Sequence, residues 1–140
     1  QLLLFYPLNS IDMGKVKILY VDDEAINLML FQANLEKKYD ILIAENPFTG
    51  LQHIAENKDI KVVVSDMKMP VMNGIEFILK ARLLSSEIAY YILTGFEITE
   101  DIQEALNQGI IRRYFRKPFN IQEISREIEN TIADYYERQE

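Results

Sequence analysis

The chain has 140 residues, of which 49% are hydrophobic and 26% charged, as in a soluble globular domain with its own core. A formal net charge of −7 argues against direct binding to nucleic acid. The lack of cysteine excludes disulfides, thiolate metal sites and a cysteine nucleophile. No apolar run approaches the roughly 20 residues that a membrane span needs, so we expect a cytoplasmic protein without a membrane partner.

Residues 1–13 differ from the rest of the chain. The apolar run from Leu2 to Tyr6 is short and is stopped by Pro7. It lacks the basic start and the small-residue cleavage site of a signal peptide, and Met13 is a plausible natural start. We therefore expect residues 1–13 to be a frayed arm or a remnant of expression, and residues 14–140 to form the domain.

From Lys15 onward, strand patterns alternate with helix patterns. β-branched and apolar runs predict strands at 16–21, 39–43, 61–66, 88–93 and 112–116. Helix-forming segments predict helices at 25–37, 47–57, 75–82, 99–108 and from 120 onward. Thr99 can cap the fourth of these helices, and Gly109 is placed to end it. Five successive strand–helix units predict an α/β domain with a parallel sheet covered by helices on both faces.

The third strand contains the candidate reacting residue. The run Val62-Val63-Val64 is typical of a strand buried on both faces, and it leads directly to Asp66. Pro70 follows soon after and cannot pair in a central strand. Asp66 is therefore expected at the carboxyl end of a central strand, where open α/β sheets bind their ligands.

Acidic residues also follow the first strand, where Asp22, Asp23 and Glu24 are consecutive. Because the carboxyl ends of parallel strands share one edge, Asp22, Asp23 and Asp66 should gather there. Packed carboxylates destabilise a fold unless a cation neutralises them, and Mg²⁺ prefers such oxygen ligands. The alternative is that the acidic triplet only complements the dipole of the first helix. The second acidic strand end favours the metal.

Two further strand ends complete the candidate site. Thr94, followed by Gly95, supplies a hydroxyl after the fourth strand, and Lys117 supplies an ammonium after the fifth. A carboxylate nucleophile, a metal, a hydroxyl and a lysine at one edge suit phosphoryl transfer, which depends on positioning and charge neutralisation. The only histidine, His53, falls within the second helix, where we expect a surface residue without a phosphodonor role.

This pattern resembles the receiver domain of two-component response regulators, from about Lys15 to the C-terminus. The matching pieces, in order, are Asp22-Asp23, Asp66, Met69-Pro70, Asn73-Gly74, Thr94-Gly95, Tyr114 and Lys117-Pro118. The resemblance implies a flavodoxin-like (βα)5 fold in three layers, with five parallel strands in the order 2-1-3-4-5.

The resemblance also implies roles at the acidic edge. Asp66 would accept a phosphoryl group from a sensor histidine kinase, a phosphotransfer protein or a small donor such as acetyl phosphate. Asp23, Asp66 and the backbone carbonyl of Lys68 would hold Mg²⁺ directly, and Asp22 would hold it through water. Such a protein is a phosphoacceptor in signalling and catalyses only its own phosphorylation and dephosphorylation.

Lys117 and Thr94 would hold the phosphoryl oxygens, and the Lys117–Pro118 bond would be cis. Tyr114 would move inward together with Thr94 and so change the surface made by the fourth helix, the fifth strand and the last helix. Through this surface the domain would form a homodimer or bind an output protein. Its expected charges are acidic on the fourth helix and basic on the fifth strand: Glu97, Glu100, Asp101 and Glu104 against Arg112, Arg113 and Arg116.

Other classes fit the same residues less well. An aspartyl-nucleophile phosphatase of the haloacid-dehalogenase type needs an acid two residues after the nucleophile, where this chain has Lys68, and the chain has no room for a cap domain. A flavin or nucleotide binder needs a phosphate-cradling loop after the first strand, where Asp22 and Asp23 would repel the ligand. A purely structural pseudo-receiver tends to lack part of the constellation, and here every part is present.

Overall fold

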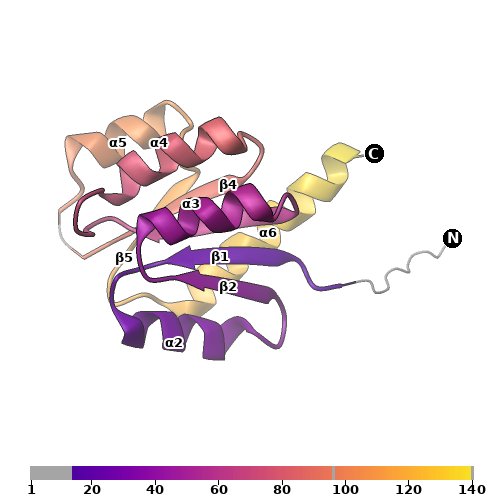
Figure 1. The fold of residues 1–140 in the computed structure, drawn as a ribbon. Coiled ribbons are helices and arrows are strands. Elements are labelled where there is room, and N and C mark those ends of the chain that lie inside the picture. The colour runs from indigo at the N-terminus through magenta and orange to yellow at the C-terminus, as the bar shows by residue number, and fades with distance from the viewer. Residues whose placement is uncertain (1–13, 96, 140) are drawn as a thin grey trace, which may run out of the picture.

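The structure is a computed structural model that describes residues 14–95 and 97–139, so the expectation for residues 1–13 lies outside the described residues. Strands and helices alternate along the chain, close to the predicted boundaries (Figure 1). They are β1 (Lys17–Val21), α2 (Ala25–Leu35), β2 (Asp40–Ala44), α3 (Pro47–Glu56), β3 (Ile60–Asp66), α4 (Gly74–Leu84), β4 (Ala89–Thr94), α5 (Glu100–Asn107), β5 (Arg113–Arg116) and α6 (Ile121–Gln139).

The five strands form one parallel sheet in the order β2-β1-β3-β4-β5. This confirms the predicted flavodoxin-like fold. The chain reverses its direction of winding between β1 and β3, and ligand sites of open α/β sheets lie outside the carboxyl ends at such a point. Asp66 therefore lies at the edge of the sheet where a fold of this topology is expected to bind a ligand.

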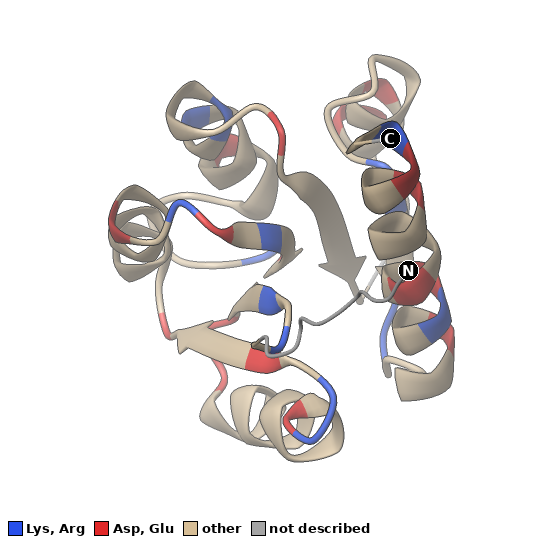
Figure 2. Cartoon of the chain, turned by 90° about the vertical axis from the view of Figure 1, so that its right-hand side faces the viewer, with Lys and Arg blue, Asp and Glu red and all other residues tan. Residues whose placement is uncertain are grey.

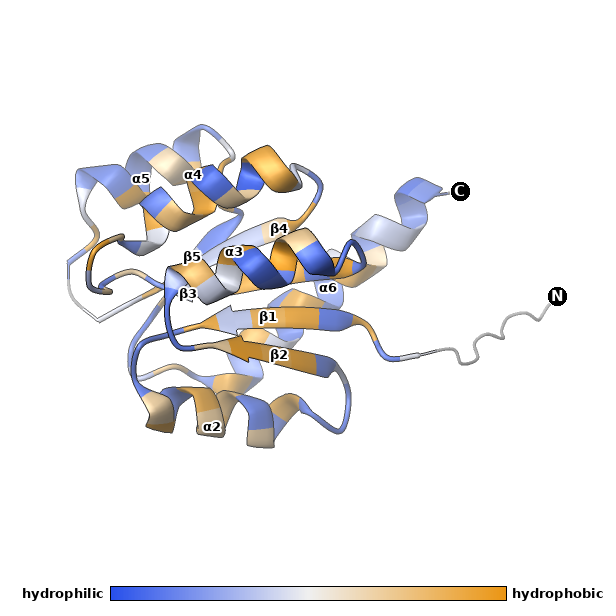
Figure 3. Ribbon diagram, in the orientation of Figure 1, coloured by the Kyte–Doolittle hydropathy of each residue, from blue (hydrophilic) through white to orange (hydrophobic). Residues whose placement is uncertain are grey.

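Helices cover both faces of the sheet and enclose two apolar cores (Figure 1). Side chains of α3, α4 and α5 pack on one face, and those of α2 and α6 pack on the other. Because side chains alternate along a strand, Leu19 and Val63 enter the first core while Tyr20 and Val64 enter the second. Strands β1 and β2 are apolar over most of their length, whereas the helices show mixed faces (Figure 3).

Helix ends follow from local sequence. The side chains of Asn46, Asn73 and Thr99 each accept a hydrogen bond from a backbone N–H in the first turn of α3, α4 and α5. Gly109 has a φ of 74° just beyond α5, the left-handed conformation that commonly ends a helix. The expectations that Thr99 begins this helix and that Gly109 ends it are confirmed.

The C-terminal turns of α6 extend beyond the amino ends of the strands (Figure 1). Seen from that side, acidic and basic residues are interspersed on the helices (Figure 2). None of the helices among the described residues combines the length and the apolar character needed to cross a membrane.

Candidate functional site

The chemically active residues of the sequence meet at the carboxyl edge of the sheet. Asp66 is the last residue of β3 and Thr94 the last of β4, while Asp22 and Lys117 come directly after β1 and β5. Together with Asp23, Asp66, Thr94 and Lys117 line an open cleft. The exposed Lys68 lines the same cleft from the loop after β3. The structure thus brings every predicted site residue except Tyr114 to this edge.

Three carboxylates form the floor of the site. Asp22 is 0% exposed and Asp66 is 3% exposed, whereas Asp23 is open to solvent. One carboxylate oxygen from each lies within 4.8 Å of those of the other two. Asp22 also accepts a hydrogen bond from the backbone N–H of Glu24 at 2.9 Å, so it shapes the turn into α2 as well.

Asp66 and Lys117 form an ion pair across two strands. The Oδ1 atom of Asp66 lies 2.8 Å from Nζ of Lys117. Burial raises the pKa of Asp66 to about 6; the Lys117 ammonium opposes this shift, and the Asp22 and Asp23 carboxylates add to it. Burial lowers the pKa of Lys117, but the carboxylates of Asp66, Asp22 and Glu24 together outweigh burial, and the net shift is upward. Lys117 is therefore a cation beside the candidate nucleophile.

The donor set fits a hard divalent cation. Asp66 Oδ1 is buried, and the cation beside it is the Lys117 ammonium at 2.8 Å. One ammonium cannot balance three clustered carboxylates, and a bound divalent cation would supply the missing positive charge. Three carboxylates with no nitrogen or sulfur ligand match the preference of Mg²⁺ for oxygen.

Thr94 and Tyr114 occupy adjacent strands. Thr94 is 4% exposed, and its backbone oxygen accepts a hydrogen bond from the N–H of Lys117 at 2.8 Å. Tyr114 pairs with Ile92, two residues before Thr94, so Tyr114 and Thr94 share a side of the sheet. The ring of Tyr114 is half-buried against the core under α5. The Lys117–Pro118 peptide bond is cis, as expected.

The loop between Asp66 and α4 is held tightly against the site. A Cβ atom on Gly74 would lie 2.5 Å from the backbone oxygen of Asp66, so only glycine fits at this point. Asn73 and Glu76 form a reciprocal capping box at the start of α4. Val71 has a φ of 74° within a tight turn in which the N–H of Met72 donates to the carbonyl of Pro70. A β-branched residue in this conformation is strained, and nothing in the sequence indicated it.

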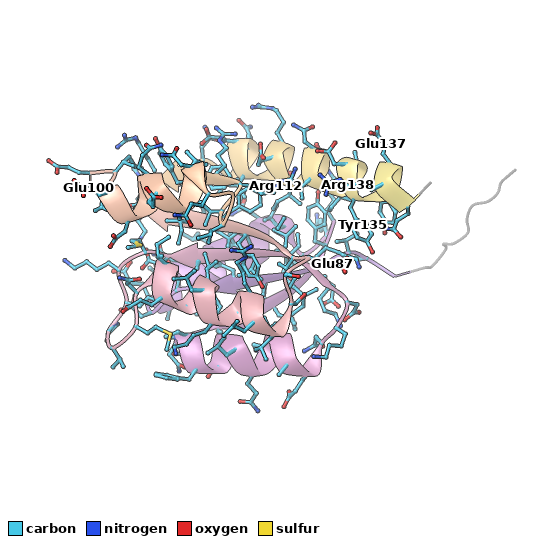
Figure 4. The ribbon with its side chains drawn as sticks, turned by 90° about the horizontal axis from the view of Figure 1, so that it is seen from above. Glu87, Glu100, Arg112, Tyr135, Glu137 and Arg138 are labelled. Carbon is cyan, nitrogen blue, oxygen red and sulfur yellow. The ribbon has the colours of Figure 1, made fainter. Side chains whose placement is uncertain are left out.

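A second, smaller cavity lies at the opposite end of the sheet. It is lined by Lys61, Glu87, Arg112, Tyr135 and Arg138, among others. Lys61 fills part of this region, because its Nζ donates to the hydroxyl of Tyr135 at 3.0 Å. Figure 4 shows Glu87 and Tyr135 far from Glu100, which begins α5 at the carboxyl edge. This cavity lacks a carboxylate cluster, so the candidate site is the one at the carboxyl edge.

Comparison with known proteins identifies the class. A family model described as the response regulator receiver domain matches residues 18–129. The chain therefore belongs to the receiver domain family of response regulators. The sporulation initiation phosphotransferase F of Bacillus subtilis is 32% identical to it over 109 residues, which are 77% of this chain and 86% of that protein.

Longer proteins and solved structures are also similar. The uncharacterized transcriptional regulatory protein YesN of Bacillus subtilis is 35% identical over 84% of this chain, but the match spans only 33% of YesN. The crystal structure of a response regulator receiver domain protein from Clostridium thermocellum has a TM-score of 0.81 and 32% identity, covering 86% of this chain and 97% of that one.

The raised pKa of Asp66 gives a first prediction, for the protein in EDTA. Between its unfolded pKa near 4 and its folded pKa near 6, Asp66 binds more protons in the folded state, so its contribution to stability is lost as pH rises through this window. The unfolding free energy of Asp66→Asn, compared with that of wild type at the same pH, should therefore rise by about 2 kcal/mol between pH 4 and pH 7. Urea unfolding at both pH values measures the difference.

The matched control is Asp40→Asn, which removes an exposed carboxylate from the amino end of β2, across the sheet from the site. Its pH-dependent difference from wild type should be well below that of Asp66→Asn. Equal differences for the two variants would contradict the assignment of the effect to the buried cluster.

Proposed function

We propose that the domain accepts a phosphoryl group on Asp66 in a Mg²⁺-dependent reaction and passes the signal to a partner. The observation that carries this proposal is the pairing of a buried strand-end carboxylate with Lys117 at 2.8 Å, beside two further carboxylates. Membership of the receiver family supports it. Phosphoryl transfer needs positioned charge more than covalent machinery, and this edge of the sheet supplies such charge.

In the reaction, a carboxylate oxygen of Asp66 forms a bond to phosphorus as the bond to the donor breaks. The bonding electrons leave with the histidine of a kinase or phosphotransfer protein, or with acetate when the donor is acetyl phosphate. Lys117 and the Thr94 hydroxyl would hold the phosphoryl oxygens. Asp22, Asp23, Asp66 and the backbone carbonyl of Lys68 would hold Mg²⁺, which neutralises the charge on those oxygens.

The partners follow from the same proposal. A sensor histidine kinase or a phosphotransfer protein would donate the group, and a separate protein or domain would read the phosphorylated state. The name of one relative, sporulation initiation phosphotransferase F, supports transfer of a phosphoryl group between proteins. We further propose that the domain works in the cytoplasm as a signalling domain rather than an enzyme acting on other substrates, without binding nucleic acid or a membrane itself.

Incubation with acetyl phosphate and Mg²⁺, followed by intact mass measurement, tests the proposal. We expect one added phosphoryl group per chain with Mg²⁺ and none when EDTA replaces it. A chain that stays unmodified with several small donors and with histidine-phosphorylated proteins would overturn the proposal. Release of free phosphate from many phosphate esters would instead favour a phosphatase of the haloacid-dehalogenase type, which Lys68 disfavours.

We also propose that phosphorylation changes the switch surface, defined here as α5, β5 and α6. Phosphorylation adds about −1.5 to −2 charges at pH 7, which would draw Thr94 and Lys117 inward and leave space for Tyr114. Glu100, Asp101 and Glu104 lie on α5, and Arg113 and Arg116 lie on β5, as expected, whereas Arg112 comes directly before β5. Arg113 pairs with Glu123 and Glu127, and Arg112 with Asp134, all on α6, because β5 packs beside that helix.

The prediction for the switch concerns Thr94. Thr94→Ala should still be phosphorylated on Asp66 but should lose most of the change in the switch surface. The variant lacks the hydroxyl that would move toward the phosphoryl group. Light scattering with and without beryllofluoride, a phosphoryl mimic, detects dimer formation, and hydrogen exchange of β5 and α6 detects the change itself.

Arg116→Glu is the matched surface variant, because Arg116 is exposed on β5 and pairs with no carboxylate among the described residues. It should weaken self-association without changing phosphorylation. If light scattering gives the wild-type protein the same mass with and without beryllofluoride, phosphorylation does not cause dimer formation. The switch would then act through binding of an output protein. Full switching in Thr94→Ala would contradict the role of its hydroxyl.

A further inference from the structure

Tyr20 is a buried tyrosine whose hydroxyl points at the candidate metal site. It lies on β1 two residues before Asp22, so both side chains fall on the same side of the sheet. Its hydroxyl donates to Oδ2 of Asp22 at 2.6 Å, and the Tyr20 side chain is fully buried. A bond this short to a buried carboxylate is of the strong, charge-assisted kind.

Asp22 has little accepting capacity left after its contacts within the chain. Its Oδ2 accepts from Tyr20 and also from Nδ2 of Asn27 at 3.1 Å, while its Oδ1 accepts from the N–H of Glu24 at 2.9 Å. A carboxylate offers about four lone-pair sites, two on each oxygen. Oδ2 is therefore filled by two donors, and a single site remains on Oδ1.

The rings around Tyr20 fix the position of its hydroxyl. Its ring stacks on Phe31 of α2 with centroids 4.2 Å apart and meets the edge of Phe119 at 6.4 Å. Phe31 and Phe119 are also in contact, at 6.3 Å. Phe119 comes directly after the Lys117-Pro118 turn. The Tyr20 ring is thus confined by the helix that follows Asp22 and by the segment that carries Lys117.

We propose that the Tyr20 hydroxyl is a positioning group for the Mg²⁺ site, which holds the Asp22 carboxylate in one orientation with only Oδ1 available to the ion or its water. Asp22 is then restricted to a supporting role, while Asp23 and Asp66 keep their oxygens for direct contact. The inference rests on the proposed function, because it needs Mg²⁺ to bind at this edge. Hydrogen bonds to metal-ligand side chains typically set metal affinity in this way.

Tyr20→Phe tests the proposal, because it removes the hydroxyl and keeps the ring that stacks on Phe31. Titration calorimetry with Mg²⁺ alone should show a dissociation constant about 3- to 10-fold higher than that of wild type. This is less than the roughly 10- to 100-fold typical of groups that orient a direct ligand, because Asp22 supports the ion indirectly. An unchanged or lower constant would overturn the proposal. Failure of wild type itself to bind Mg²⁺ would instead overturn the proposed function.

Tyr91→Phe is the matched control for the loss of a buried tyrosine hydroxyl. Tyr91 lies on β4 on the same face of the sheet, but its hydroxyl bonds to Thr131 and Glu127 of α6. It should lose stability as Tyr20→Phe does while keeping the Mg²⁺ affinity of wild type. An equal loss of affinity in both variants would show a general effect of destabilisation and overturn the proposal.

The Asp22→Asn background separates positioning from packing. If Tyr20 acts through Asp22, adding Tyr20→Phe to Asp22→Asn should change the Mg²⁺ constant by less than about twofold, because the coupled partner is already gone. If Tyr20→Phe raises the Mg²⁺ dissociation constant in the Asp22→Asn background as much as it does in wild type, the proposal is overturned. Should Tyr20→Phe fail to fold, Asn27→Ala decides instead, since it removes the other donor to Oδ2 from a half-buried position on α2. It should also weaken binding, and an unchanged constant would count against the proposal.

Discussion

Asp66→Asn should abolish phosphoryl acceptance while leaving the protein folded. The amide is close in size to the carboxylate but cannot form the acyl phosphate, and Asp66 alone joins a central strand end to Lys117. Acetyl phosphate with Mg²⁺, followed by intact mass and peptide mapping, should show one phosphoryl group in wild type and none in the variant. Circular dichroism checks that the fold is kept.

Asp40→Asn again serves as the control and should be phosphorylated as wild type is, because Asp40 lies at the amino end of β2. A phosphoryl group found in the Asp66→Asn variant on a peptide that contains Asp22 or Asp23 would falsify the choice of nucleophile. The same result would still leave the carboxyl edge as the reactive site.

Magnesium should stabilise the folded protein. The three clustered carboxylates repel one another, and a cation that binds only the folded state shifts unfolding by mass action. At ten times its dissociation constant, Mg²⁺ contributes about 1.4 kcal/mol, which raises the Tm of a domain of this size by about 3 to 5 °C. Thermal unfolding followed by circular dichroism, in EDTA and in rising Mg²⁺, measures the shift.

Asp23→Asn should reduce this response several-fold and should leave the metal-free protein at least as stable as wild type, because one of the repelling charges is removed. Asp23 is exposed, so the substitution leaves no buried group without a partner. The absence of any Tm shift in wild type at millimolar Mg²⁺ would argue against a metal site. Equal shifts in wild type and Asp23→Asn would remove Asp23 from the ligand set.

The layout of the site could be predicted because it depends on strand ends. A β-branched run fixes where β3 lies, and the parallel topology then places Asp66 beside the residues at the carboxyl ends of β1, β4 and β5. Short-range signals such as Thr99 and Gly109 also marked helix ends correctly. Each of these features is set by a few adjacent residues, so one sequence is enough to find them.

Features that depend on packing between distant segments could not be predicted. Tyr20 looked like one more apolar strand residue, and only the approach of its hydroxyl to Asp22 shows a polar role. Arg113 pairs with glutamates of α6. The position of α6 beside β5 depends on the tertiary packing, so the sequence of β5 alone does not indicate this pairing. His53 is half-buried with a ring nitrogen 3.1 Å from the backbone oxygen of Ile43, where the sequence favoured a surface position.

The two ion pairs of Arg113 join the start of α6 to β5. Glu123 and Glu127 lie one turn apart, so a single guanidinium clamps the first turns of α6 to β5, next to Tyr114. The part of α6 beyond Glu127 is about 18 Å long at 1.5 Å per residue, and its end extends past the sheet. A rigid tilt of α6 by about 10° at these ion pairs would move the far end of the helix by about 3 Å. Under the proposed switch, a small displacement of β5 would therefore be passed to α6 and would reach the opposite end of the molecule.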